Sequence, residues 1–313
     1  MSAGGAQFRP RLQARRTLGW LFAAVCVLFS LTSLLVLGVL LVEVFRVGWP
    51  ALSWTFIRNL PSVLFPEQAG IWTALIGSIW TVAITALAAI PLGIGAAVYL
   101  EEYAPRNWLT NAISINIANL AGVPSIVYGI LGLAIFVRWL EFDRSVLSGG
   151  LTLALLVLPV IIIASREALA AVPDSVRQAA YAVGATRWQT IRHHVLPAAL
   201  PGIITGVILA LSRAVGEAAP LIMIGALAYV TSVPGGSFEG YDHSLAGVWS
   251  WLRDAMLADF SAMPIQIYNW TDAPQKEFHV LAAAGIIVLL GGLLTMNAVA
   301  VGIRAWRQVH RTW

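Results

Sequence analysis

The chain has 313 residues, of which 59% are hydrophobic and 11% are charged, and its mean hydropathy is +0.80. Soluble globular domains carry about 25% charged residues, so the composition excludes that class and indicates an integral membrane protein. The net charge of +4 does not indicate nucleic-acid binding, because Lys276 is the one lysine and the arginines stand mostly at the ends of apolar runs.

Six apolar runs approach or exceed the roughly 20 residues that cross a bilayer as a helix. They are continuous and do not alternate with polar residues, which favours helices over strands. In chain order they are Leu18–Val42, Ile71–Leu100, Asn111–Val137, Gly149–Ala164, Ala198–Val230 and His279–Ile303. We therefore predict an all-α membrane protein with six transmembrane helices.

These runs predict the organisation of the chain. Residues 1–17 form a tail, and residues 18–70 hold the first transmembrane helix and the segment that follows it. A transmembrane domain covers 71–303, and residues 304–313 form a second tail. Two connections inside that domain are long, 165–197 and 231–278. The stretches VWSWLRDAML and IQIYNW in the second connection predict short helices at the membrane surface.

The distribution of basic residues predicts which loops of the chain lie on the cytoplasmic side of the membrane. Twelve arginines fall in the tails and on the side of the 165–197 loop, and six basic residues fall on the opposite side: Arg46, Arg58, Arg138, Arg144, Arg253 and Lys276. The excess predicts that both termini and the 165–197 loop are cytoplasmic, and that the 231–278 loop is external. Arg213 belongs to no loop.

Arg213 and Glu217 stand four residues apart in the fifth run, and Arg213 lies about 22 Å from the start of that run at 1.5 Å per residue. On one helix the two side chains would share a face and pair. A mid-membrane arginine costs roughly 2.5–3.5 kcal/mol, so we interpret the pair as a contact on a substrate pathway; the alternative is an ion pair that fixes helix register. The planar guanidinium suits two-pronged contact with an oxyanion.

Two prolines interrupt these runs. We expect Pro220 to bend the fifth helix near the charged pair, because it leaves the carbonyl of Gly216 without a donor. We expect Pro124 to kink the third helix, with a gating hinge as the alternative. Glu101 and Glu102 at the end of the second run are interpreted as solvated caps, and Tyr128 as part of an aromatic belt at the membrane surface.

The loop 165–197 carries the most specific motif, QAAYAVGATRWQTIRHHVLP, which starts at residue 178. Pro173 and Asp174 predict the start of a helix, and Gly184 predicts its end at the C′ position. A second segment then runs to Pro197. The pattern predicts an elbow of helix, glycine and helix that projects from the membrane.

This elbow resembles the EAA loop of ATP-binding-cassette importer permeases, in which Glu-Ala-Ala precedes a glycine and a closing Leu-Pro. The motif positions are held by Gln178, Ala179, Ala180, Gly184, Leu196 and Pro197. Gln178 replaces the usual glutamate, and His194 stands where an aliphatic residue is common. The resemblance implies a MetI-like permease core whose elbow is the coupling helix that docks on an ATPase subunit.

Three further stretches, LAGVPSIVYGILGLAIF, SRAVGEAAPLIMIGA and MPIQIYNWTDAPQKEFHVLAAAGIIVLL, resemble phosphate-importer permeases of the PstA family. That resemblance implies phosphate import by alternating access across the bacterial inner membrane. It also implies a second, PstC-like permease as heterodimer partner, two copies of a PstB-like ATPase and a periplasmic PstS-like phosphate-binding protein. ATP and Mg would belong to the ATPase.

The motifs that are absent limit the function further. A Walker A motif needs a lysine in G-x-x-x-x-G-K-[ST], and the sole lysine, Lys276, follows DAPQ. The sequence holds no Ser-His-Asp set, HExxH or CxxC, so we predict a subunit without catalysis, cofactor or metal. One alternative is a permease for another oxyanion, namely sulfate, molybdate or phosphonate. The other is an ion-coupled carrier or channel, but that function would not explain the elbow.

Overall fold

The computed structural model describes residues 12–226, 229–230, 232–236, 241 and 244–309. Among these residues the regular structure is helical, with one isolated bridge between Ser145 and Asp259. Five of the described helices are long and apolar enough to cross a membrane, and the bent pair α4 and α5 supplies a sixth span if it is taken as one. The predicted all-α membrane fold is confirmed.

The helices follow one another along the chain in this order: α1 (Leu12–Gly48), η1 (Trp49–Ala51), α2 (Trp54–Arg58), η2 (Pro66–Gln68), α3 (Trp72–Val98), η3 (Tyr99–Tyr103), α4 (Trp108–Ala121), α5 (Ser125–Gly132), η4 (Leu133–Trp139), α6 (Val146–Ala170), α7 (Asp174–Ala182), α8 (Arg187–Thr190), η5 (Ile191–Val195), α9 (Leu196–Gly216), α10 (Ala219–Ile224), α11 (Leu245–Met256), α12 (Met263–Asp272) and α13 (Lys276–Val309). The elements η3, η4 and η5 are π-helical and continue the α-helices beside them.

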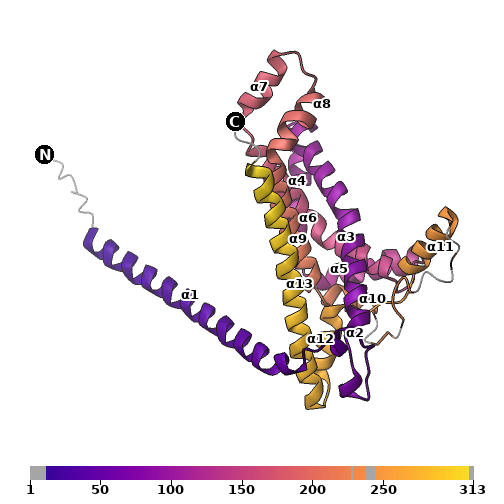
Figure 1. Ribbon diagram of the computed structural model, residues 1–313. Helices are drawn as coiled ribbons and strands as arrows, with labels where there is room; N and C mark the ends of the chain where they lie inside the picture. Colours follow the sequence, from indigo (N-terminus) through magenta and orange to yellow (C-terminus); the bar gives the residue numbers. More distant parts are fainter. Residues whose placement is uncertain (1–11, 227–228, 231, 237–240, 242–243, 310–313) are drawn as a thin grey trace.

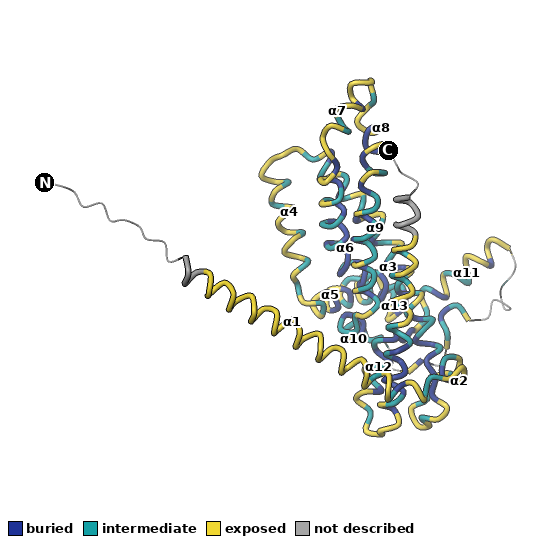
Figure 2. The backbone as a smooth tube through the Cα atoms, turned by 60° about the vertical axis from the view of Figure 1, so that its left-hand side comes forward, coloured by how far each residue is buried: buried dark blue, intermediate teal, exposed yellow. Residues whose placement is uncertain are grey.

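Helix α6 is the centre of the bundle (Figure 2). It is apolar on all sides, and 67% of its membrane-crossing window is buried, as expected for a core helix. Small residues bring α3 close to it: the Thr85 hydroxyl donates to the Gly150 carbonyl at 3.0 Å. A Cβ on Gly150 would lie 2.6 Å from Ile84, so the α3–α6 contact requires glycine at this position.

Helix α1 extends away from the bundle along almost its whole length (Figures 1 and 2). None of its membrane-crossing window is buried within this chain. Its last residue, Gly48, packs against the backbone of Ala283 and Ala284 near the start of α13, where a Cβ would lie 2.6 Å away. The apolar surface of α1 is therefore available to lipid or to another subunit.

The two ends of the bundle differ (Figure 1). Helices α7 and α8 project beyond the bundle at one end, whereas α2 and α12 lie at the other. The short helices expected in residues 231–278 are present as α11 and α12, although residues 231, 237–240 and 242–243 of this stretch lie outside the described part of the chain. Helix α12 is fixed to α3, because the Ser78 hydroxyl accepts a 2.8 Å hydrogen bond from the Met263 amide.

Candidate functional site

The third predicted span is broken at Pro124. Helix α4 ends at Ala121, α5 starts at Ser125, and their axes meet at 102°. Pro124 has no N–H for the carbonyl of Leu120, and the Tyr128 hydroxyl donates to that carbonyl at 2.8 Å instead. Tyr128 is buried at the break, so its interpretation as an aromatic-belt residue at the membrane surface was wrong.

The fifth predicted span is broken as well. Helix α9 ends at Gly216, Glu217 adopts an extended backbone (φ −85°, ψ 113°), and α10 starts at Ala219. Pro220 occupies the first turn of α10, where its missing N–H costs no hydrogen bond. The expectation of one bent helix through Arg213 and Glu217 was therefore wrong, because the first helix ends at Gly216 and a new one starts at Ala219.

The charged pair forms across this break. Arg213 Nε donates to Glu217 Oε1 at 3.1 Å, so the predicted pairing is present although Glu217 lies beyond the helix end. The Arg213 side chain is 43% exposed and that of Glu217 is 20% exposed. Next to them, a Cβ on Gly216 would meet no atom within 4 Å. The pair thus borders open space within this chain.

The two breaks lie against each other. Helix α5 packs on α10, and a Cβ on Gly129 would lie 2.8 Å from both Pro220 Cα and Met223 Cβ. Toward the break, the uncovered residues of α9 recur at helical spacing and form one stripe: Leu209, Arg213 and Gly216. Farther from the break this side of α9 turns toward α6, because a Cβ on Gly202 would lie 2.8 Å from Ala168. The arginine therefore belongs to a stripe at the end of α9 that no other described part of this chain covers.

The elbow has the predicted form. Helix α7 starts after Pro173 and ends at Ala182, and Gly184 follows with a left-handed backbone (φ +83°). Thr186 and Gln189 form a capping box that opens the next helix, which continues without interruption from Arg187 to Gly216. One continuous helix thus joins the elbow to the charged pair.

The motif residues of the elbow divide into two groups. Gln178, Ala179 and Gly184 are exposed, whereas Ala180 is buried and Leu196 and Pro197 are half-buried at the start of α9. The tip of the elbow also exposes Val183, at 84%, and Trp188, at 56%. Apolar side chains exposed at the end of a projecting loop are typical of a surface that binds another protein.

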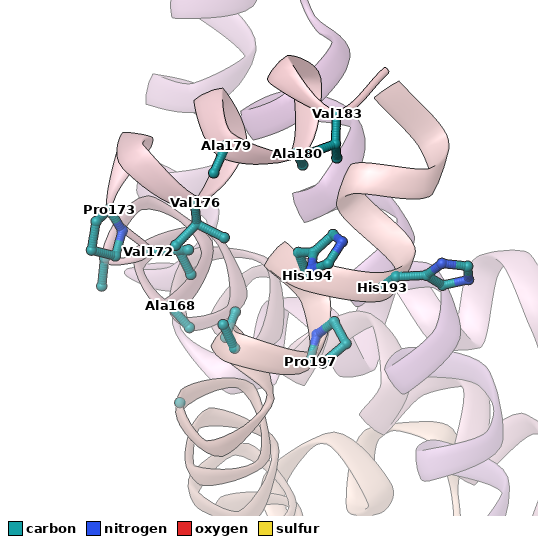
Figure 3. A pocket seen from close by; sticks show the side chains of 14 residues that line it. Ala168, Val172, Pro173, Val176, Ala179, Ala180, Val183, His193, His194 and Pro197 are labelled. Atoms are coloured by element: carbon teal, nitrogen blue, oxygen red, sulfur yellow. The ribbon is translucent and has the colours of Figure 1, made fainter. Parts of the chain in front are cut away.

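A cavity of about 1040 Å³ lies beneath α7 (Figure 3). Val176 and Ala180 of α7 line it together with His194 and Pro197 of the following helix. Its lining is mostly alanine, valine and proline, with His193 and His194 as polar side chains, and more than half of the lining residues are exposed, so it is an open hollow between α6, α7 and α9.

Glu101 and Glu102, in η3, form ion pairs at the end of the bundle that carries the elbow. Sequence analysis did not predict these pairs. Arg177 of α7 donates to both carboxylate oxygens of Glu102, with Nη2–Oε1 at 2.6 Å. Glu102 is 7% exposed, so its interpretation as a solvated cap was wrong. Its hydrogen bonds are the largest influence on the pKa of Arg177 and raise it above the usual value, against the opposing effect of burial. Glu101 instead pairs with Arg166 of α6 at 3.4 Å.

A core of several membrane-crossing helices with a helical elbow projecting from one end is typical of the permease domains of transporters. A family model described as the binding-protein-dependent transport system inner membrane component matches residues 89–307. The chain belongs to that family. It is accordingly a multi-pass membrane protein with the fold of ABC-transporter permeases.

Relatives and solved structures agree with this assignment. The chain is 33% identical to phosphate transport system permease protein PstA 1 of Mycobacterium tuberculosis over 307 residues, which cover 95% of this chain and 92% of that protein. It is 32% identical to the PstA protein of Yersinia pestis over 231 residues, which cover 74% of this chain and 71% of that one.

Two solved structures share the fold at lower identity. A chain of a bacterial alginate ABC transporter aligns with a TM-score of 0.57 at 14% identity, covering 93% of this chain and 96% of that one. A chain of the MetNI methionine ABC transporter in an inward-facing conformation aligns with a TM-score of 0.54 at 17% identity, covering 76% and 97%. These likenesses concern the fold alone.

Proposed function

We propose that this chain is a permease subunit of an ATP-driven importer that moves inorganic phosphate into the cytoplasm by alternating access. The observation that carries the proposal is the Arg213–Glu217 pair on the uncovered face of α9, at the break between α9 and α10. Ionisable residues inside a membrane mark substrate routes by default. The phosphate permeases among the relatives support phosphate as the substrate.

Arg213 acts in this proposal as a transient anion contact. Its guanidinium stays charged and offers a planar fork of donors to phosphate oxygens. Glu217 holds the guanidinium at 3.1 Å when no anion is present, and its negative charge prevents the anion from being held too tightly. Gly216 keeps the space beside the pair open.

The uncovered stripe of α9 faces, in this proposal, a second permease subunit of the PstC type, and the substrate route runs between the two chains. Relatives of the PstC type, such as that of Haemophilus influenzae, 29% identical over 232 residues, support a partner of the same fold. The proline breaks at Pro124 and Pro220 serve as hinges beside this route, because a broken helix bends there at little cost.

The elbow supplies the coupling. Gln178, Ala179 and Gly184 lie on its exposed surface, together with Val183 and Trp188, and form the contact with one of two copies of an ATPase subunit. ATP and Mg are bound and hydrolysed there, and this chain contributes no catalytic group. The elbow and both tails lie on the cytoplasmic side, and a periplasmic binding protein delivers the anion to the opposite end.

Uptake by the reconstituted complex tests this function. Liposomes that contain both permeases and the ATPase, with binding protein outside and ATP inside, are expected to accumulate labelled phosphate. Sulfate, molybdate and a phosphonate, each added in excess, are expected to leave that uptake unchanged. Accumulation of one of those anions in place of phosphate would assign the chain to another oxyanion, and uptake without ATP would favour an ion-coupled carrier.

A further inference from the structure

We propose that Glu102 is the positioning residue that fastens the coupling elbow to the end of α3, so that the elbow and α3 move together. Glu102 lies in η3, the π-helical turn that continues α3. Both helices of the elbow reach this one residue. The inference rests on the proposed role of the elbow as the ATPase contact.

The first connection runs through Arg177 on α7. Its Nε lies 3.2 and 3.4 Å from the two oxygens of Glu102, and its Nη2 lies 2.6 Å from Oε1. Nη2 also donates to the carbonyl of Leu169 at 3.1 Å, and Nη1 donates to the carbonyl of Val172 at 2.7 Å, where α6 ends. Nη1 donates in addition to Asp174 of the same helix, at 3.2 Å. Arg177 is 16% exposed. A forked contact of this kind fixes direction as well as distance, because a planar guanidinium cannot rotate without losing hydrogen bonds.

The second connection runs through Arg187 on α8. Its Nη2 donates to the backbone carbonyl of Glu102, and its guanidinium lies 5.0 Å from the ring centre of Tyr103. Arg187 begins the continuous helix that ends at Gly216. Glu102 therefore joins α3 to α7 through its side chain and to the helix that carries Arg213 through its backbone.

The adjacent carboxylate serves as a built-in comparison. Glu101 also lies in η3, with its side chain 25% exposed, but its partner Arg166 belongs to α6. Arg166 in turn donates to the Ser114 hydroxyl of α4 at 2.8 Å. The hydrogen bonds and the ion pair of Glu101 thus stay inside the bundle, and its charge adds only the smallest of the effects on the pKa of Arg177, which makes Glu101 a matched control.

Substitution of Glu102 by Gln keeps the size of the side chain and the backbone carbonyl for Arg187, but removes the charge and one of the two acceptor oxygens. In this variant, movement of the elbow that is driven by the ATPase is no longer transmitted to α3. We expect the complex to assemble and to hydrolyse ATP, while the stimulation of hydrolysis by loaded binding protein falls by at least about fivefold, the lower end of typical site-to-site coupling. Glu102→Asp, which keeps the charge, is expected to recover part of the stimulation.

Two measurements test the inference in the assembled complex. ATPase rates are measured with and without loaded binding protein for wild type, Glu102→Gln, Glu102→Asp and Glu101→Gln. Hydrogen–deuterium exchange of residues 174–182 is measured on the same samples, and faster exchange is expected in Glu102→Gln alone. Unchanged exchange and unchanged stimulation in Glu102→Gln, or equal losses in Glu101→Gln, would overturn the proposal.

The same experiment separates this inference from the proposed function. If the wild-type complex shows no stimulation by binding protein, the importer function is contradicted, and hydrogen–deuterium exchange alone then decides whether Glu102 fastens the elbow. If wild type is stimulated and Glu102→Gln behaves like wild type in both measurements, the function stands and the inference fails.

Discussion

Gly129 of α5 lies so close to Pro220 of α10 that a Cβ on the glycine would be 2.8 Å from the proline Cα and 2.9 Å from its carbonyl oxygen. The contact joins the break in the third span to the break in the fifth. Two helices that cannot continue at their prolines therefore support each other in the interior of the bundle. The charged pair Arg213–Glu217 lies at the same junction.

This contact predicts a large effect from one methyl group. Gly129→Ala forces the backbone of α10 to shift, and overpacking of this kind costs about 1–3 kcal/mol. We expect a lower melting temperature for the complex in detergent and reduced uptake. Gly95→Ala is the matched control, because a Cβ on Gly95 meets no atom within 4 Å. Equal melting temperatures for the two variants would contradict the close packing of the breaks.

Removal of the Tyr128 hydroxyl is expected to lower the thermal stability by a smaller amount. Tyr128→Phe removes the donor to the Leu120 carbonyl at the α4–α5 break, where the Val123 amide, at 3.1 Å, remains as a partner. A neutral hydrogen bond contributes about 1 kcal/mol, so we expect a modest loss of thermal stability. Hydrogen exchange should increase around residues 120–125 and remain unchanged in α6. A variant as protected as wild type at the break would show that the hydroxyl does not hold it.

The left-handed backbone of Gly184 predicts that the elbow tolerates some residues and not others. A β-branched residue at φ +83° is strained by roughly 1–2 kcal/mol, whereas asparagine visits this region readily. A Cβ there meets no neighbouring atom, so the effect comes from the backbone alone. We expect Gly184→Val to reduce the stimulation of the ATPase by binding protein, and Gly184→Asn to retain most of it. The reverse order would contradict the conformational argument.

The sequence predicted an all-α membrane protein and the approximate place of its long apolar helices because hydropathy and length indicate which segments can cross a membrane. It also predicted the elbow, since Pro173 and Gly184 act locally, through a fixed φ and a left-handed φ. The pairing of Arg213 with Glu217 followed from their spacing, although the helix between them is broken.

The missed features depend on contacts between distant parts of the chain. Glu102 looked like a cap because its partners, Arg177 and Arg187, stand 75 and 85 positions away and nothing local indicates them. The breaks were underestimated for a related reason. A proline inside an apolar run bends or ends a helix according to what packs against it, and Pro91 and Pro159 lie inside continuous helices of the same protein.

The role of Arg213 is the central claim, and a double substitution tests it most directly. If the pair only fixes the fold, then removing both charges relieves the cost of an unpaired ion, and Arg213→Ala with Glu217→Ala should transport better than Arg213→Ala alone. If Arg213 contacts the anion, the double variant stays inactive, whereas Arg213→Lys keeps partial uptake because it retains the charge without the fork.

Phosphate uptake by reconstituted complexes, wild type beside Arg213→Ala, Arg213→Lys and the double variant, is therefore the decisive measurement. Stimulation of the ATPase by loaded binding protein, measured on the same liposomes, controls for assembly and coupling. The account predicts uptake in wild type, reduced uptake in Arg213→Lys and none in the other two, with the ATPase still stimulated. Uptake near the wild-type rate in Arg213→Ala or in the double variant would contradict it.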